Sequence, residues 1–167
     1  MSPKTIIYPI FLPHLGCPHL CIYCNQHAVT STAGNIPDPI REARHRMEAY
    51  ARDVRANGKR GELAFYGSTF TALPVPILRW IMNMAQPLVQ AGLFSGIRFS
   101  TRPDALEEEV LTVLSEYPVT TVEIGVQSLA DIVLTATGRG YLVEDVLRTA
   151  ERVKRQGWRL GLQLMVG

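Results

Sequence analysis

The sequence has few cysteines, few charges and no long apolar run, and each shortage excludes a class of protein. Three cysteines in 167 residues are an odd number, which does not fit a small secreted scaffold held by disulfides. No segment approaches the roughly 18 apolar residues of a transmembrane helix. The apolar start is short, contains Pro9 and lacks a small-residue cleavage site, so no secretory signal is expected. We therefore expect a cytoplasmic protein without a membrane partner.

Basic and acidic residues are nearly equal in number, but they are not evenly distributed along the chain. A net charge of +2 by itself predicts no nucleic-acid partner, and 47% hydrophobic residues suffice for a core. Residues 41–60 nevertheless hold seven Lys or Arg against three acids, and residues 148–159 hold five against one. Both stretches are predicted helices. Their charges belong either to solvated helix faces or to an RNA-facing surface, and the sequence leaves both readings open.

All three cysteines lie within eight residues, at Cys17, Cys21 and Cys24. A CxxxCxxC spacing brings three thiolates around one small object, one ligand fewer than usually closes a cubane iron–sulfur cluster or a structural zinc site. One metal position would then stay free for chemistry. A zinc site completed by a neighbouring histidine is the alternative, and the candidates are His14, His19 and His27.

Short runs rich in β-branched and aromatic residues alternate with helical patterns along the chain. Strands are predicted at residues 5–12, 62–66, 97–101, 121–126 and 159–166. Apolar stripes between them predict helices over residues 40–54, 77–88, 106–114 and 143–153. Pro87 should end or kink the second helix, Asp104 is the expected N-cap of the third, and Gly157 should close the fourth.

Strand–helix alternation predicts an α/β fold with a parallel sheet, in which functional groups gather at the carboxyl ends of the strands. Short motifs follow the predicted strands at those ends. They are Phe65-Tyr-Gly-Ser-Thr-Phe-Thr71, Ser100-Thr-Arg-Pro-Asp104, Glu123-Ile-Gly-Val-Gln-Ser128, Arg139-Gly-Tyr141 and Gly161-Leu-Gln-Leu-Met-Val-Gly167.

Together with the cysteine loop, residues 11–26, these motifs resemble the radical S-adenosylmethionine (SAM) superfamily, in particular the branch of the Elongator catalytic subunit. The oxygen-independent coproporphyrinogen oxidases are a more distant likeness. The resemblance implies a partial (β/α) barrel of about five parallel strands. It runs from about residue 6 to the last residue, so residues 1–167 would form a radical SAM core that is incomplete at its C-terminus.

The resemblance also implies the chemistry. Cys17, Cys21 and Cys24 would hold a 4Fe–4S cluster, and SAM would chelate the free iron. An electron from the cluster would cleave SAM to a 5′-deoxyadenosyl radical, which requires a reducing electron donor. The implied substrate is the wobble uridine of a tRNA. A tetrapyrrole substrate is the first alternative, and a non-catalytic zinc or iron–sulfur fragment is the second.

The family's SAM contacts carry over by position. Tyr23 would lie near the adenine, and Arg139 would pair with the SAM carboxylate, a task suited to a planar fork of donors. The other implied SAM-binding residues follow the strands: Gly67, Ser68, Thr69, Ser100, Arg102, Gln127 and Gln163. Ser68 stands where relatives have a second glycine, which would strain the backbone if that position needs a positive φ. No residue is assigned as a catalytic acid or base.

Overall fold

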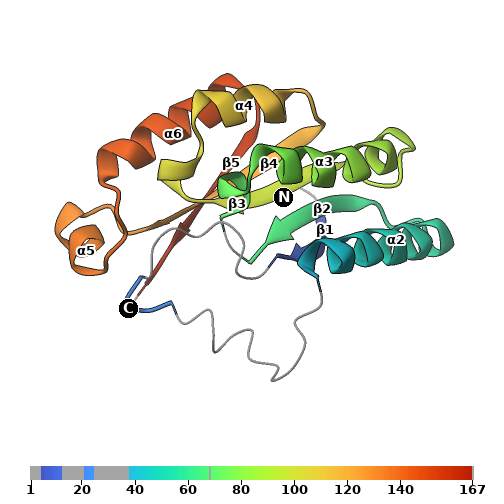
Figure 1. Ribbon diagram of the computed structural model, residues 1–167, viewed down its shortest axis with the longest axis horizontal. Helices are drawn as coiled ribbons and strands as arrows, with labels where there is room; N and C mark the ends of the chain where they lie inside the picture. The colour runs from blue at the N-terminus through green and yellow to red at the C-terminus, as the bar shows by residue number, and fades with distance from the viewer. Residues whose placement is uncertain (1–4, 13–20, 25–37, 68, 167) are drawn as a thin grey trace.

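The computed structural model describes residues 5–12, 21–24, 38–67 and 69–166. Five strands form one parallel sheet in the order β1-β2-β3-β4-β5 (Figure 1). The strands are β1 (Ile6–Phe11), β2 (Gly61–Tyr66), β3 (Gly96–Thr101), β4 (Val119–Gln127) and β5 (Arg159–Leu164). All five predicted strands are confirmed, with differences of a few residues at their ends.

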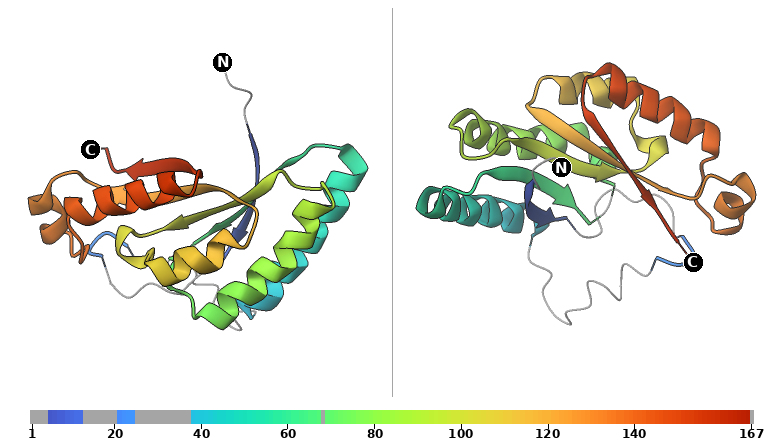
Figure 2. Two further views of the ribbon diagram at one scale, coloured as in Figure 1. Left: turned by 90° about the horizontal axis from the view of Figure 1, so that it is seen from above. Right: turned by 180° about the vertical axis from the view of Figure 1, so that it is seen from behind.

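Helices connect the strands and lie along one side of the curved sheet (Figure 2). They are α2 (Pro39–Asn57), α3 (Val75–Gln90), α4 (Glu108–Ser115), α5 (Asp131–Ala136) and α6 (Val143–Arg155), with short 3₁₀ turns η1 (Phe70–Ala72) and η2 (Pro103–Ala105). In the part of the chain that the structure describes, no helix is long and apolar enough to cross a membrane.

The core lies between the sheet and these helices. Alternate residues of β1 to β4, such as Leu63 and Phe65 in β2 or Ile97 and Phe99 in β3, are buried in it. Because side chains alternate across a strand, the intervening residues must face the other side of the sheet. That inner face carries the polar side chains described below.

The helix boundaries correct two expectations. Asp104 does not cap α4, which begins after Glu107, because both carboxylate oxygens of Asp104 are bonded to Arg102 at 2.9 and 2.8 Å. Pro87 was expected to end or kink α3, and it does not end the helix, which continues to Gln90. A proline near the last turn forfeits only one backbone bond, and its own carbonyl still accepts from Ala91 at 2.9 Å. Gly157 follows α6 in the left-handed conformation, as expected.

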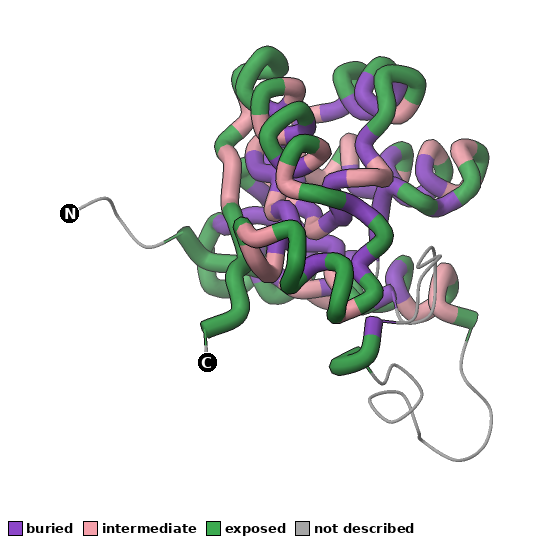
Figure 3. The backbone as a smooth tube through the Cα atoms, turned by 90° about the vertical axis from the view of Figure 1, so that its left-hand side faces the viewer, coloured by how far each residue is buried: buried purple, intermediate pink, exposed green. Residues whose placement is uncertain are grey.

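Among the described residues, β5 is the last strand of the sheet and pairs with β4. Its residues Leu162 and Leu164 are 47% and 51% exposed. Figure 3 shows the chain exposed from this strand towards the C-terminus. An apolar composition predicts a strand, but the position of that strand within the sheet decides its burial.

Candidate cofactor site

Parallel pairing brings the carboxyl ends of all five strands to the same edge of the sheet. The segment Cys21–Cys24 lies there, packed against the loop that follows α5. The amide of Ile22 donates to the carbonyl of Thr137 in that loop at 3.3 Å. The amide of Cys24 donates to the carbonyl of Cys21 at 2.9 Å, which closes a tight turn. The side chain of Cys21 is buried and that of Cys24 is exposed. Cys17 lies outside the described residues.

Arg139 points its guanidinium at the sulfur of Cys21, with Nη1 and Sγ 3.2 Å apart. Its other nitrogens are held by the protein: Nε donates to the hydroxyl of Tyr141 at 2.6 Å, and Nη2 donates to the carbonyl of Gly125 at 2.7 Å. The side chain also lies over the ring of Tyr23, 5.9 Å from its centre. The structure thus brings together Cys21, Tyr23 and Arg139, three residues that the sequence predicted to share one site.

The charge on Arg139 is secure although the residue is only 7% exposed. Burial by itself lowers the pKa of Arg139, but the hydrogen bond to Tyr141 and the neighbouring groups raise it above the ordinary value. Tyr141 is the residue that sequence reasoning missed. Its hydroxyl accepts from Arg139 and donates to the carbonyl of Gly125, so it fixes the direction of the guanidinium. Its position in the motif Arg139-Gly-Tyr141 could have indicated this role from the sequence.

Arg102 is buried beside the same sulfur, but most of its donors are occupied. Nε and Nη2 bind the carboxylate of Asp104, and Nη2 also donates to the carbonyl of Arg139. Only Nη1 faces Cys21, at 3.9 Å from Sγ. Arg102 therefore supports the loop of Arg139 and adds a second positive charge near the cysteine.

Gln127 ends β4 with a left-handed backbone, φ +65°, the only described residue other than glycine with a positive φ. The register of β4 against β5 shifts between Gly125 and Gln127, as at a β-bulge. A Cβ at Gly125 would lie 3.3 Å from Nε2 of Gln127 and 3.6 Å from Nη2 of Arg139. The irregular strand end therefore brings the Gln127 amide close to the Arg139 guanidinium.

The remaining predicted residues are less closely joined to this cluster. Gly67 has φ +109°, and a Cβ there would lie 3.1 Å from the amide nitrogen of Leu12, so glycine is needed for the close approach of two backbones. Thr69 is buried beside it. Ser100 lies on the inner face of β3, and Gln163 donates to Glu123 at 2.8 Å. Ser68, with the question of its backbone strain, lies outside the described residues.

The donor set fits the expected group. Cysteine thiolates are the ligands that iron–sulfur clusters prefer. Within residues 5–12, 21–24, 38–67 and 69–166, no group of three or more His, Cys, Asp or Glu comes together as a metal site. Two of the three expected ligands are in those ranges, so the complete set stays a prediction.

Comparison with known proteins agrees with this geometry. A family model described as the radical SAM superfamily matches residues 11–167. Elongator complex protein 3 of Schizosaccharomyces pombe is 28% identical over 98% of this chain, and a tRNA uridine(34) acetyltransferase of Methanocaldococcus infernus is 25% identical over 90%. The chain spans 37% and 35% of the lengths of these two relatives.

A solved structure shows the same fold. The archaeal Elp3 of Methanocaldococcus infernus aligns with 98% of this chain at a TM-score of 0.66 and 21% sequence identity, and the aligned part is 38% of that structure. The five-stranded parallel sheet with interleaved helices is therefore a radical SAM-like α/β fold.

Proposed function

The chain belongs to the radical SAM superfamily, and we propose that it holds a 4Fe–4S cluster through Cys17, Cys21 and Cys24 and binds SAM at the iron that these cysteines leave free. On this proposal the protein is a radical SAM enzyme of the cytoplasm, where cysteines stay reduced. The cluster supplies one-electron reductive cleavage of SAM to a 5′-deoxyadenosyl radical, using an external electron donor.

The observation that carries the proposal is the fixed guanidinium of Arg139 beside the buried sulfur of Cys21. Two hydrogen bonds to the protein set its orientation, so Nη1 is left to meet a ligand at the cysteine loop. A charged, planar donor held in this way suits the carboxylate of an amino acid.

The other residues have supporting roles in the proposal. Gln127 and the amide of Gln163 would bond the ribose, the ring of Tyr23 would lie near the adenine, and Gly67, Ser68 and Thr69 would meet the amino group. Ser100 and Arg102 would line the same end of the sheet. In support, the described members of this set all follow or end strands at one edge.

We propose the wobble uridine of a tRNA as the substrate. Support comes from the names of the similar proteins, Elongator complex protein 3 and tRNA uridine(34) acetyltransferase. Arg41, Arg52 and Arg55 on the exposed side of α2 form no ion pair with any described residue, which is consistent with an RNA partner.

Electron paramagnetic resonance tests the cofactor proposal. Anaerobically reconstituted and dithionite-reduced protein should give a 4Fe–4S signal that changes when SAM is added. Cys21→Ala should abolish bound iron, whereas Arg139→Lys should keep the cluster and weaken the response to SAM, because lysine lacks the planar fork. A full cubane retained in Cys21→Ala, or bound zinc in place of iron, would overturn the proposal.

A further inference from the structure

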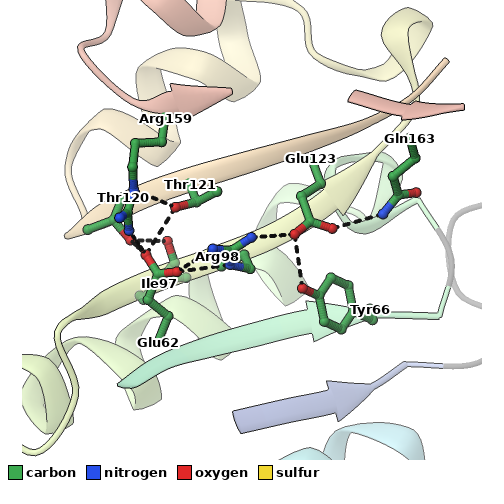
Figure 4. Close-up of polar contacts among 9 residues, drawn as sticks. All are labelled: Glu62, Tyr66, Ile97, Arg98, Thr120, Thr121, Glu123, Arg159 and Gln163. Atoms are coloured by element: carbon green, nitrogen blue, oxygen red, sulfur yellow. Dashed lines mark hydrogen bonds and ion pairs between the residues drawn. The ribbon is translucent and has the colours of Figure 1, made fainter. Parts of the chain in front are cut away.

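The inner face of the sheet is unusual for the interior of a barrel. Barrel interiors are normally filled by layers of bulky branched side chains. Here the inner positions of β2 to β5 are mostly polar or small, and Figure 4 shows the polar ones linked across the strands. These positions are Glu62, Ala64, Tyr66, Arg98, Ser100, Thr121, Glu123, Gly125, Arg159, Gly161 and Gln163.

The lower layer of this face, towards the amino ends of the strands, is closed. The carboxylate of Glu62 is fully buried and accepts from Arg98 at 2.7 and 2.9 Å and from Thr121 at 3.0 Å. Thr120 and Arg159 also bind it. A buried carboxylate with so many donors is satisfied by the protein and has no capacity for a ligand.

The upper layer is different, because its carboxylate is only partly used. Oε1 of Glu123 accepts from Arg98 and from the hydroxyl of Tyr66 at 3.2 Å, and among the described residues Oε2 accepts only from Gln163, at 2.8 Å. Burial and the charge of Glu123 raise the pKa of Tyr66 to about 12, so Tyr66 remains a donor. Oε2 keeps acceptor capacity directed at the inner face.

The side chain of Glu123 itself occupies the space over Gly161. Gly161 stands opposite Glu123 in the β4–β5 register, and a Cβ at Gly161 would lie 3.0 Å from Cγ of Glu123. Gly125 and Ala64 likewise add little bulk. Glu123 therefore lies over a floor of small residues, on the same face and towards the same end as the cofactor site.

The chemistry of the layer selects a donor. All three guanidinium nitrogens of Arg98 are engaged by Glu62 and Glu123, so no cation is available there for a carboxylate or phosphate. What is left is the Oε2 acceptor, the carbonyl and second N–H of the Gln163 amide, and the hydroxyl of Ser100. Such a surface suits a neutral ring with an N–H beside a carbonyl, and repels an anion.

We infer that Glu123 is the base-recognising residue of the proposed site and accepts the N3–H of the substrate uracil, with Tyr66, Arg98 and Gln163 holding its carboxylate in place. The inference rests on the proposed function and adds to it the group that reads the base. Gln163 binds Glu123 through its Nε2, so the side-chain carbonyl of Gln163 is left for the proposed ribose contact.

The test is a binding ratio measured without SAM or reduction. Anticodon stem-loop RNAs that carry uridine or 3-methyluridine at the first anticodon position are compared by fluorescence anisotropy. Native protein should prefer uridine about tenfold, the value of a hydrogen bond to a charged acceptor. In Glu123→Gln the ratio should fall to about one, because Arg98 and Tyr66 retain the amide oxygen and turn its NH₂ towards N3–H.

Two further variants make the result decisive. Gly161→Ala keeps the charge but pushes its methyl group against Cγ of Glu123, and should lower the ratio several-fold. Glu116→Gln removes an exposed carboxylate that also pairs with an arginine, Arg79 at 2.6 Å, and should leave the ratio unchanged. Equal ratios in the native, Glu123→Gln and Gly161→Ala proteins would overturn the inference, as would displacement of the RNA by a porphyrin tetracarboxylate in a Glu123-dependent way.

This outcome is separable from the cofactor test. If the protein prefers uridine but shows no SAM-dependent signal, Glu123 keeps its role and the radical SAM proposal fails. If the protein shows the SAM-dependent signal but no uridine preference, the cofactor proposal stands and the role of Glu123 fails.

Discussion

At the scale of single residues, the site depends on side chains that hold other side chains. Arg139 has three groups of donors, and two of them are spent on Tyr141 and Gly125. Only the third faces the cysteine. The direction of the guanidinium is therefore set by residues that need not touch the cofactor themselves.

Tyr141→Phe tests this positioning. The variant removes the hydroxyl that accepts from Arg139, so we expect SAM affinity to fall about three- to tenfold while the cluster still assembles. Isothermal titration with reconstituted protein measures the affinity, and the iron content checks the cluster. Tyr117→Phe is the matched control, because Tyr117 is also nearly buried and donates to Asn83 at 3.0 Å. Equal losses of SAM affinity in both variants would deny Tyr141 a specific role.

Gln127 combines backbone strain with a proposed contact. A non-glycine residue in the left-handed region costs about 1 kcal/mol. Glycine avoids this strain, but it loses more conformational entropy on folding, which partly offsets the gain. Gln127→Gly should therefore leave the free energy of unfolding unchanged or raise it slightly, while SAM affinity falls. Urea unfolding and SAM titration measure the two effects.

Gln127→Asn is the companion variant, because asparagine tolerates the same backbone conformation and keeps an amide. It should lose less SAM affinity than the glycine variant. Native SAM affinity in Gln127→Gly would remove Gln127 from the site.

At the scale of elements, α2 separates its buried and charged faces. Ala43, Met47, Ala51 and Val54 are buried, and the basic residues lie outside. Arg46 pairs with Glu42 at 2.8 Å and Arg44 lies 3.8 Å from Glu48. Arg41, Arg52 and Arg55 form no ion pair with any described residue, and their spacing places them on one exposed helix face.

Charge reversal on α2 distinguishes an RNA-facing surface from a solvated one. Replacing Arg41, Arg52 and Arg55 with glutamate should lower tRNA affinity at least tenfold and flatten its dependence on salt. The control reverses Arg46, Arg79 and Arg148, which lie off this helix face and are already engaged by acids. Similar losses from the two sets would indicate an effect of net charge and would not support a binding face on α2.

At the scale of the whole molecule, one buried carboxylate joins the sheet. Glu62 in β2 binds Arg98 in β3, Thr121 in β4 and Arg159 in β5. Burial by itself raises the pKa of Glu62, but hydrogen bonds from Thr120 and Arg98 hold this pKa below the ordinary value of 4.5. Because the unfolded chain binds this proton more readily, the stabilisation is present above pH 4.5 and is lost as the pH falls through the lower folded value.

Glu62→Gln should reveal that linkage. At neutral pH the variant should lose about 3 kcal/mol of unfolding free energy, because the arginines lose a charged partner in a buried network. The difference from native protein should shrink as the pH falls below 4.5 and through the lowered folded pKa of Glu62, because native Glu62 then takes up its proton. Urea unfolding across this range measures it. A difference that stays constant with pH would show that Glu62 contributes packing and no charge.

The local patterns of the sequence predicted the elements well. Each strand was a run of apolar and β-branched residues, and each long helix carried an apolar stripe, so local composition sufficed. The errors arose where two local signals competed or where an element was short. Asp104 fits the pattern of a helix cap, but its near neighbour Arg102 binds its carboxylate, and the short helix α5 has too few residues for a clear period.

The sequence by itself determined the cysteine triplet, the parallel α/β class and the collection of motifs at the strand ends, because each depends on spacing along the chain. Only the tertiary structure decided that Tyr141 orients Arg139, that Arg139 meets the sulfur of Cys21 and that Gln163 binds Glu123 on the inner face. The contact of Cys21 with Arg139 joins residues 118 positions apart, and that of Gln163 with Glu123 joins residues 40 positions apart. Chain periodicity carries no information about which side chains such a fold brings into contact.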